Sequence, residues 1–143
     1  MQPLLPPKKA ILPFRLKTLS VEIPDPDMGG YLFYSVADKE QDAIFSDTKL
    51  RWGEFQAERY IRKLHDHLSL LCDNKALWRR VPGRLTEKAG IRETVYVSRF
   101  ERHYIFFRQL PSGRLGVMSL LHVQMDIPDR LAKDLQIALR ERH

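Results

Sequence analysis

His122 is the side chain in this sequence best suited to proton transfer. It follows the apolar run Leu115–Leu121, and Asp126 lies four residues beyond it. An imidazole near a carboxylate can act as a general acid or base, because the pKa of histidine is about 6.5. A histidine at the end of an apolar strand is also commonly a hydrogen-bonded residue of the core or its rim. We favour this second interpretation over catalysis.

His65 and His67 resemble a pair of metal ligands, but their spacing argues against that role. They fall in a helical pattern, and residues two apart on a helix point about 200° away from each other. The two rings therefore cannot close on one ion. We interpret them as solvent-exposed or helix-flank histidines, and the sequence predicts neither a metal site nor a cofactor.

Positive charge is the most general chemical feature of the chain. The net charge is +6 over 143 residues, and nearly all of the excess lies beyond residue 27. A surface of this kind attracts anions such as nucleic acid or an acidic protein segment. The alternative for any single arginine is a solvated basic face. The basic positions that stand out are Arg79, Arg80, Arg84, Lys88, Arg92, Arg99, Arg102, Arg140 and Arg142.

Several classes of protein are excluded by missing patterns. The sequence has no glycine-rich phosphate loop and no Gly-x-Ser-x-Gly elbow. Its one cysteine, Cys72, falls near the end of an apolar helical stripe, so we interpret it as a buried small hydrophobic residue. No apolar run approaches the roughly 18 to 20 residues that a membrane helix needs. We therefore expect a soluble, non-exported protein.

Three strands are predicted in the second half of the chain. Val95–Val97, Tyr104–Phe107 and Leu115–Leu121 are rich in β-branched, aromatic and aliphatic residues, and short polar turns divide them. Pro111-Ser112-Gly113 supplies a turn, since proline presets one position and glycine accepts a positive φ. The pattern predicts a three-stranded antiparallel meander, and Tyr31–Tyr34 predicts an earlier strand.

Three helices complete the predicted order. The clearest runs from Arg51 to Cys72, because its apolar residues recur every three or four positions. A shorter helix from Val36 to about Arg51 is predicted before it, with Ser35 and Asp38 resembling a capping box. A last helix is predicted over Arg130–Arg142. The stripe of the long helix consists of Ala57, Tyr60, Ile61, Leu64, Leu68 and Leu71.

This order and three local motifs resemble the ParE branch of the RelE/ParE toxin superfamily. The motifs are Arg51-Trp52-Gly53 followed by Gln56-Ala57 and Arg59-Tyr60, then Ile105-Phe106-Phe107-Arg108, then Leu121-His122 before Met125-Asp126. The resemblance covers roughly Tyr31 to Leu131. It implies an α+β fold with a strand, a two-helix hairpin, a three-stranded antiparallel meander and a C-terminal helix.

The resemblance also implies a function. ParE toxins of type II toxin–antitoxin systems poison DNA gyrase by stabilising its cleaved DNA complex, without catalysis, and a cognate antitoxin silences them. We expect a bacterial cytoplasmic protein, and an antitoxin segment that is acidic or amphipathic and covers the groove between the sheet and the two helices. The residues that we expect to bind target or antitoxin are Arg79, Arg80, Arg84, Arg99, Arg102, Arg140 and Arg142.

Two alternatives stay open at this point. RelE-like members of the superfamily are ribosome-dependent endoribonucleases that cut messenger RNA, a reaction that needs an acid, a base and cations around the phosphate. Arg84, Arg99 and Arg108 could supply the cations and His122 the acid or base. The lysine-rich patch of RelE has no counterpart here, so we favour the non-catalytic toxin. The second alternative is an inactive family member that only binds its antitoxin or nucleic acid.

The chain departs from the ParE pattern at three places. Gln41 replaces a residue that is usually apolar, Asp47 replaces a frequent tyrosine, and Val123-Gln124 replaces a frequent Gly-Arg pair. The last change removes a basic residue beside His122. No role of a family arginine can therefore be transferred to that position.

Residues 1–27 differ from the rest of the sequence. Six of the nine prolines lie here, which predicts an extended arm in place of a regular helix, although Leu16–Ile23 could add an edge strand. Related toxins begin close to their first strand, near the position of Met28. We therefore expect a toxin domain over residues 28–143, preceded by an extension that is dispensable or that lies before a native start at Met28.

Overall fold

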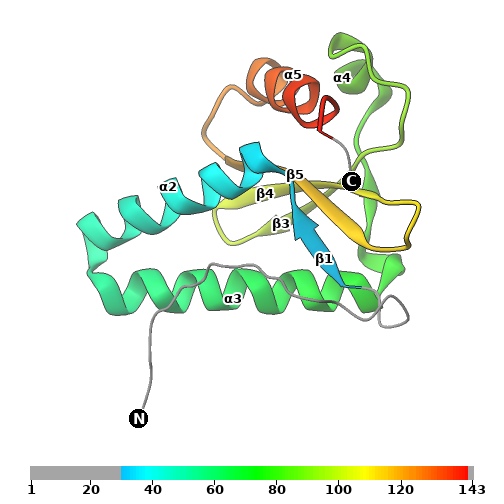
Figure 1. Cartoon of the computed structure of the whole chain (residues 1–143). Coiled ribbons are helices and arrows are strands. Elements are labelled where there is room, and N and C mark those ends of the chain that lie inside the picture. The colour runs from blue at the N-terminus through cyan, green and yellow to red at the C-terminus, as the bar shows by residue number, and fades with distance from the viewer. Residues whose placement is uncertain (1–29, 142–143) are drawn as a thin grey trace.

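A computed structural model describes residues 30–141 of the chain (Figure 1). The extension, the Leu16–Ile23 strand, the Met28 start and Arg142 lie outside these residues. The elements are β1 (Tyr31–Phe33), α2 (Ser35–Trp52), α3 (Glu54–Asp73), the 3-10 turn η2 (Lys75–Leu77), β2 (Arg79–Arg80), α4 (Gly83–Lys88), β3 (Tyr96–Phe100), β4 (His103–Gln109), β5 (Leu115–His122) and α5 (Ile127–Ala138).

The strands form one five-stranded sheet in the order β1-β5-β4-β3-β2. The predicted meander is confirmed, because β3, β4 and β5 pair antiparallel in succession. Gly113 has the positive φ of 91° that the β4–β5 turn was expected to need. β1 joins the sheet parallel to β5, and β2 adds a short edge strand that was not predicted.

The first two helices form the predicted hairpin, with corrected boundaries. Gly53, at φ 95°, ends α2 and places the start of α3 at Glu54 instead of Arg51. A non-glycine residue is strained at such a φ, which explains why the chain turns here. The predicted capping box is wrong: the N–H and Oγ of Ser35 both donate to the Glu141 carboxylate instead.

The sheet is covered on both faces, with α3 on one side and α4 and α5 on the other (Figure 1). On the α3 face, Leu64 and Leu68 pack with Ile105 and Phe107 of β4. Neighbouring strand residues alternate between the two faces. The half-buried Cys72 packs against the α3-face cluster, and burial is the main cause that raises the pKa of its thiol to about 11.

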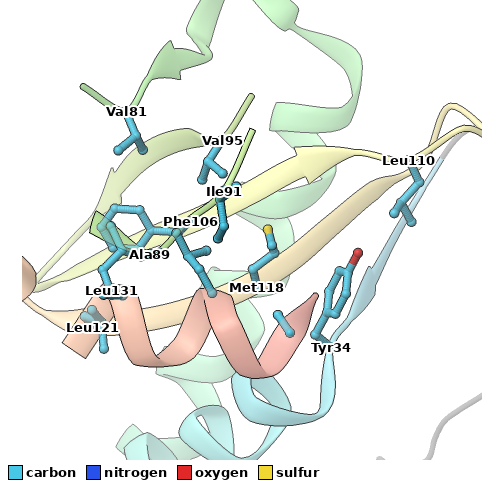
Figure 2. Packing of buried hydrophobic residues seen from close by; sticks show 13 residues of the cluster. Tyr34, Val81, Ala89, Ile91, Val95, Phe106, Leu110, Met118, Leu121 and Leu131 are labelled. Atoms are coloured by element: carbon cyan, nitrogen blue, oxygen red, sulfur yellow. The ribbon is translucent and has the colours of Figure 1, made fainter. Parts of the chain in front are cut away.

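On the other face, Phe106 and Met118 pack beneath Leu131 of α5 (Figure 2). Gly116 is required here, since a Cβ at this position would lie 2.9 Å from the Tyr34 ring. The strand pairing shifts between Phe106 and Phe107, which leaves Met118 without a partner in β4. This bulge turns both Met118 and Ser119 toward α5.

The remaining segments differ from the sequence prediction in detail. The last helix spans Ile127–Ala138, earlier than the predicted Arg130–Arg142, because Pro128 occupies its first turn, where proline is favoured. The basic segment Arg79–Arg84, for which the sequence predicted no helix or strand, contains the edge strand β2 and the start of α4. Over residues 30–141, no helix has the length and apolar character required to span a bilayer.

Candidate functional site

A hollow of about 1020 Å³ lies between the helical hairpin and the adjoining ends of β4 and β5. From α2 it is lined by residues 40, 44, 47 and 51, and from α3 by residues 56, 59, 60 and 63. These spacings of three and four residues mean that each helix presents one face to the hollow. The β3–β4 turn, the end of β5 and the start of α5 complete the walls.

Six cations line this hollow and an adjoining one of about 490 Å³, with which it shares Arg51, Arg102 and His122. Three carboxyl groups lie among them. Within residues 30–141, the ion pairs closer than 4 Å are Lys49–Glu54 and Lys88–Asp129, and neither includes a cation of the hollow. Among the described residues, the carboxyl groups therefore offset the positive charge of the hollow only in part, and none of them forms a close ion pair with its cations. The cations are Arg51, Arg59, Lys63, Arg99, Arg102 and Arg130, and the carboxyl groups are Glu40, Asp47 and Glu101.

Three aromatic side chains meet where α3 faces the sheet. The Tyr60 hydroxyl shares a hydrogen bond of 2.7 Å with Nδ1 of His103, and the His103 ring lies edge-on to His122 at 5.2 Å. Nδ1 of His122 accepts the Gln124 N–H at 3.1 Å. Burial, and secondarily the neighbouring His122, lowers the pKa of His103 to about 4. His103 is therefore neutral at physiological pH.

The back of the hollow holds a pair of acidic side chains. Oε1 of Glu40 accepts the Leu120 N–H at 2.8 Å, and the Glu40 carboxyl also bonds to Asp134. Asp134 is only 5% exposed and accepts the Ser119 hydroxyl at 2.6 Å. Burial, followed by the bond to Asp134, raises the pKa of Glu40 to about 9. Glu40 is therefore protonated at neutral pH and adds no negative charge to the hollow.

His65 lies on the α3 face of the sheet, between α3, α2 and β1. Its Nδ1 shares a 2.6 Å hydrogen bond with the Tyr31 hydroxyl, and its Nε2 bonds to Oε1 of Gln41. Of the two predicted alternatives, solvent-exposed or helix-flank, the structure shows a half-buried histidine on the flank of α3, and burial lowers its pKa to about 4. The polar Gln41, which departs from the family pattern, thus serves as the hydrogen-bond partner of this half-buried imidazole. His67 is half-buried and bonds to Ser98 instead.

The closed end of the hairpin carries an apolar rim. Leu50, Trp52 and Phe55 are 86%, 65% and 72% exposed, although large apolar side chains are usually buried. This end of the hairpin extends beyond the sheet (Figure 1), and Trp52 lines the hollow. Met125, from the loop before α5, also lines the hollow. An exposed apolar rim beside a cationic interior is typical of a binding surface.

The structure brings together only some of the predicted site residues. Arg99, Arg102 and His122 line the smaller hollow together. The exposed Arg79 and Arg80 lie on the edge strand β2. Three further predicted residues lie elsewhere: Arg84 in α4, Arg140 just after α5, and Arg142 outside the described residues.

The residues of the ribonuclease alternative do not converge. Arg108 pairs with Gly116, whereas His103 pairs with His122. Arg108 therefore lies five residues along β4 from the histidine pair, about 16 Å at the usual rise of a strand. Arg84 and Arg108 line neither hollow.

The sequence analysis missed most of the hollow. Arg51, Arg59, Lys63, Arg130, Tyr60 and His103 all line it and were not chosen. The four-residue spacing of Arg59 and Lys63, with Tyr60 between them, was a usable signal for a polar face on α3. Which face would border a hollow depends on the position of α2, and no local pattern gives that position.

The fold and the hollow define the class of protein. A strand, a helical hairpin, an antiparallel meander and a covering C-terminal helix form the RelE/ParE-like toxin fold that the sequence predicted. The family model described as ParE toxin of type II toxin-antitoxin system, parDE, matches residues 31–127. The chain belongs to this family.

Curated relatives agree with the family model. The chain is 27% identical to Toxin ParE of Escherichia coli over 109 residues, which cover 76% of this chain and 99% of the relative. It is 29% identical to Toxin ParE1 of Mycobacterium tuberculosis over 105 residues, 71% of this chain and 96% of the relative. The protein is therefore a ParE-type toxin of a type II toxin–antitoxin system, and it has a cognate antitoxin as partner.

Proposed function

We propose that the toxin inhibits DNA gyrase in the bacterial cytoplasm by binding, without catalysing a reaction. The observation that carries the proposal is the hollow, in which cations that form no close ion pair with a described residue lie behind the exposed apolar rim of Trp52 and Phe55. Apolar anchors and steering charge are what a binding inhibitor of a large DNA-bound enzyme needs. Arg84 and Arg108 lie away from Arg99 and His122, which line the smaller hollow, and this separation favours gyrase inhibition over ribonuclease activity.

We also propose that the antitoxin neutralises the toxin by filling the same hollow. At about 1020 Å³, the hollow has about the volume of two turns of an α-helix, whose diameter with side chains is about 10–12 Å. Carboxylates on such a helix would face Arg59, Lys63 and Arg102, and apolar residues would contact Trp52. An acidic amphipathic segment fits both parts of the surface.

A supercoiling assay with the purified full chain tests the target. We expect the toxin to block supercoiling by gyrase and to increase the amount of cleaved DNA, and the antitoxin to reverse both effects. Primer extension on translated messages provides the parallel measurement. Cleavage of those messages together with unaffected supercoiling would show that the ribosome is the target.

Paired charge variants test the antitoxin site. The hollow variant Arg59→Ala/Lys63→Ala and the control Arg79→Ala/Arg80→Ala remove the same charge from exposed positions. We expect the hollow variant to weaken antitoxin binding at least tenfold and the control less than twofold, measured by calorimetry. Equal losses in the two variants would place the antitoxin elsewhere.

A further inference from the structure

The hollow has an excess of positive charge that no described side chain balances. Six cations face three carboxyl groups across the two adjoining hollows, and one of these groups, Glu40, is protonated at neutral pH. About four positive charges are therefore uncompensated. A concave surface focuses such a field and raises the local concentration of anions.

The rings in the hollow distinguish between possible anions. Trp52 lies exposed at the rim, and Tyr60, His103 and His122 lie further in. An acidic amphipathic peptide would pair with the cations and pack apolar side chains on Trp52, but it would not stack flat rings on the aromatic side chains. A nucleic acid strand uses both, because its bases stack on aromatic side chains while its phosphates contact arginine and lysine.

The rings favour a single strand over a duplex. In a duplex the bases are paired and stacked on one another, so they are not free to stack on Trp52, whereas the bases of a single strand are free to do so. A single strand with its bases unstacked can follow the cations from Arg59 and Lys63 to Arg102.

We propose that this hollow binds single-stranded nucleic acid, with phosphates against Arg59, Lys63 and Arg102 and a base stacked on Trp52. This inference goes beyond gyrase inhibition and requires no gyrase. The phosphodiester backbone and the bases are common to DNA and RNA, so either could be the natural source of the strand. An antitoxin helix in the same hollow would exclude the strand.

Fluorescence anisotropy with the full chain and labelled fifteen-nucleotide oligo-dT and oligo-U tests the proposal. With about four phosphates neutralised at a slope of about −0.7 each, affinity should fall about fifty-fold between 50 and 200 mM salt. Similar affinity for the two oligonucleotides, or preference for one, supports the proposal and identifies the source. Absence of binding to both at 50 mM salt overturns it.

Matched variants test the location. Arg59→Ala/Lys63→Ala should weaken oligonucleotide binding at least tenfold and make the salt slope shallower by about 1.4. Arg79→Ala/Arg80→Ala removes the same charge outside the hollow and should change affinity less than twofold. Equal losses would mean non-specific attraction by net charge and would overturn the proposal.

Trp52 gives an independent measurement. Trp52→Ala should weaken oligonucleotide binding about tenfold through loss of stacking and leave the salt slope unchanged. Poly-glutamate serves as the competing ligand. Binding of poly-glutamate that depends on Arg59 and Lys63, with unchanged oligonucleotide affinity in Trp52→Ala, would assign the hollow to an acidic peptide and overturn the proposal.

The two proposals can fail separately. Oligonucleotide binding in the hollow without inhibition of supercoiling keeps the strand site and removes gyrase as the target. The opposite result is also possible: supercoiling is still inhibited by Arg59→Ala/Lys63→Ala, and neither oligonucleotide binds. That result keeps gyrase as the target and removes the strand site. Circular dichroism of each variant confirms that the fold is intact, since all four substituted basic residues are exposed.

Discussion

The two faces of the sheet are both apolar, yet each encloses a titratable group with a strongly shifted pKa, and these two groups respond to pH in opposite directions. On the α3 face, burial keeps His65 neutral by lowering its pKa to about 4. On the α5 face, Glu40 is kept protonated by burial and by Asp134, with a pKa of about 9. Both faces therefore disfavour charged side chains. Burial lowers the pKa of a base and raises the pKa of an acid.

Both networks are held by neighbouring residues of one helix. Glu40 bonds to β5 and α5, and Gln41 bonds to His65 in α3. α2 is therefore fixed to both layers at the point where it starts to form the wall of the hollow. The shape of the binding surface depends on both networks together.

The largest effect should come from truncating the two neighbouring phenylalanines of β4, one on each face. Phe107→Ala and Phe106→Ala should each cost about 3–5 kcal/mol in unfolding free energy. Phe107 should cost more, because it also contacts the rings of Trp78 and Tyr96. Chemical denaturation measures the difference, and Phe→Leu at each site gives the same ranking if an alanine variant does not fold. A larger loss of unfolding free energy for Phe106→Ala would mean that packing on the α5 face contributes more to stability than packing on the α3 face.

Acid should selectively weaken the α3 face. The pKa of His65 is lowered from 6.5 to about 4, so its contribution is complete above pH 6.5 and is lost as the pH falls toward 4. The loss should be about 3 kcal/mol, and His65→Gln should remove most of it relative to the unsubstituted chain. His67→Gln is the matched control, since His67 is less enclosed. An unchanged acid response in His65→Gln would show that other groups, such as His103, dominate.

A rise in pH from 4.5 to 9 should selectively weaken the α5 face. The pKa of Glu40 is raised from 4.5 to about 9, so its contribution is complete below pH 4.5 and is lost as the pH rises to 9. Because Glu40 also borders the hollow, where water screens its charge, we expect a loss of about 2 kcal/mol. Glu40→Gln keeps both hydrogen bonds and should remove this slope in pH-dependent thermal melts. The control Glu87→Gln, at an exposed position, should leave this slope unchanged. Identical slopes of stability against pH in the two variants would refute the assignment of the slope to Glu40.

The smallest effects should come from removing one hydroxyl on each face. Tyr31→Phe removes the bond to His65, and Ser119→Ala removes the bond to Asp134. Each should cost about 1 kcal/mol, the typical net value of one hydrogen bond. The exposed Ser112→Ala provides the reference. If only Ser119→Ala lowers the unfolding free energy, the two faces differ further, because the hydrogen-bond network on the α5 face then depends on the β5 bulge that orients Ser119.

Much of the fold followed from local patterns. The alternation in β4 and β5 and the helical stripe of Leu64, Leu68 and Leu71 predicted the meander and α3. The errors arose where tertiary contacts replaced local ones: Ser35 bonds to Glu141, more than a hundred residues away, instead of capping α2. β2 was missed because two arginines form an edge strand only when β3 lies beside them.

The candidate site was much less predictable. Arg99, Arg102 and His122 could be chosen because they lie next to a turn or a strand end. The spacing of Arg59 and Lys63 gave only the signal of a polar face on α3, and Arg130 gave none, because their charges meet only after α3 and α5 have packed. The sequence alone determined the order of the main helices and strands and the excess of positive charge, since periodicity and composition are local properties. Its motifs also carried the resemblance to the family. Only the tertiary structure decided where that charge faces a common space, because the hollow is bounded by α2, α3, β5 and α5, and its position depends on how all four pack.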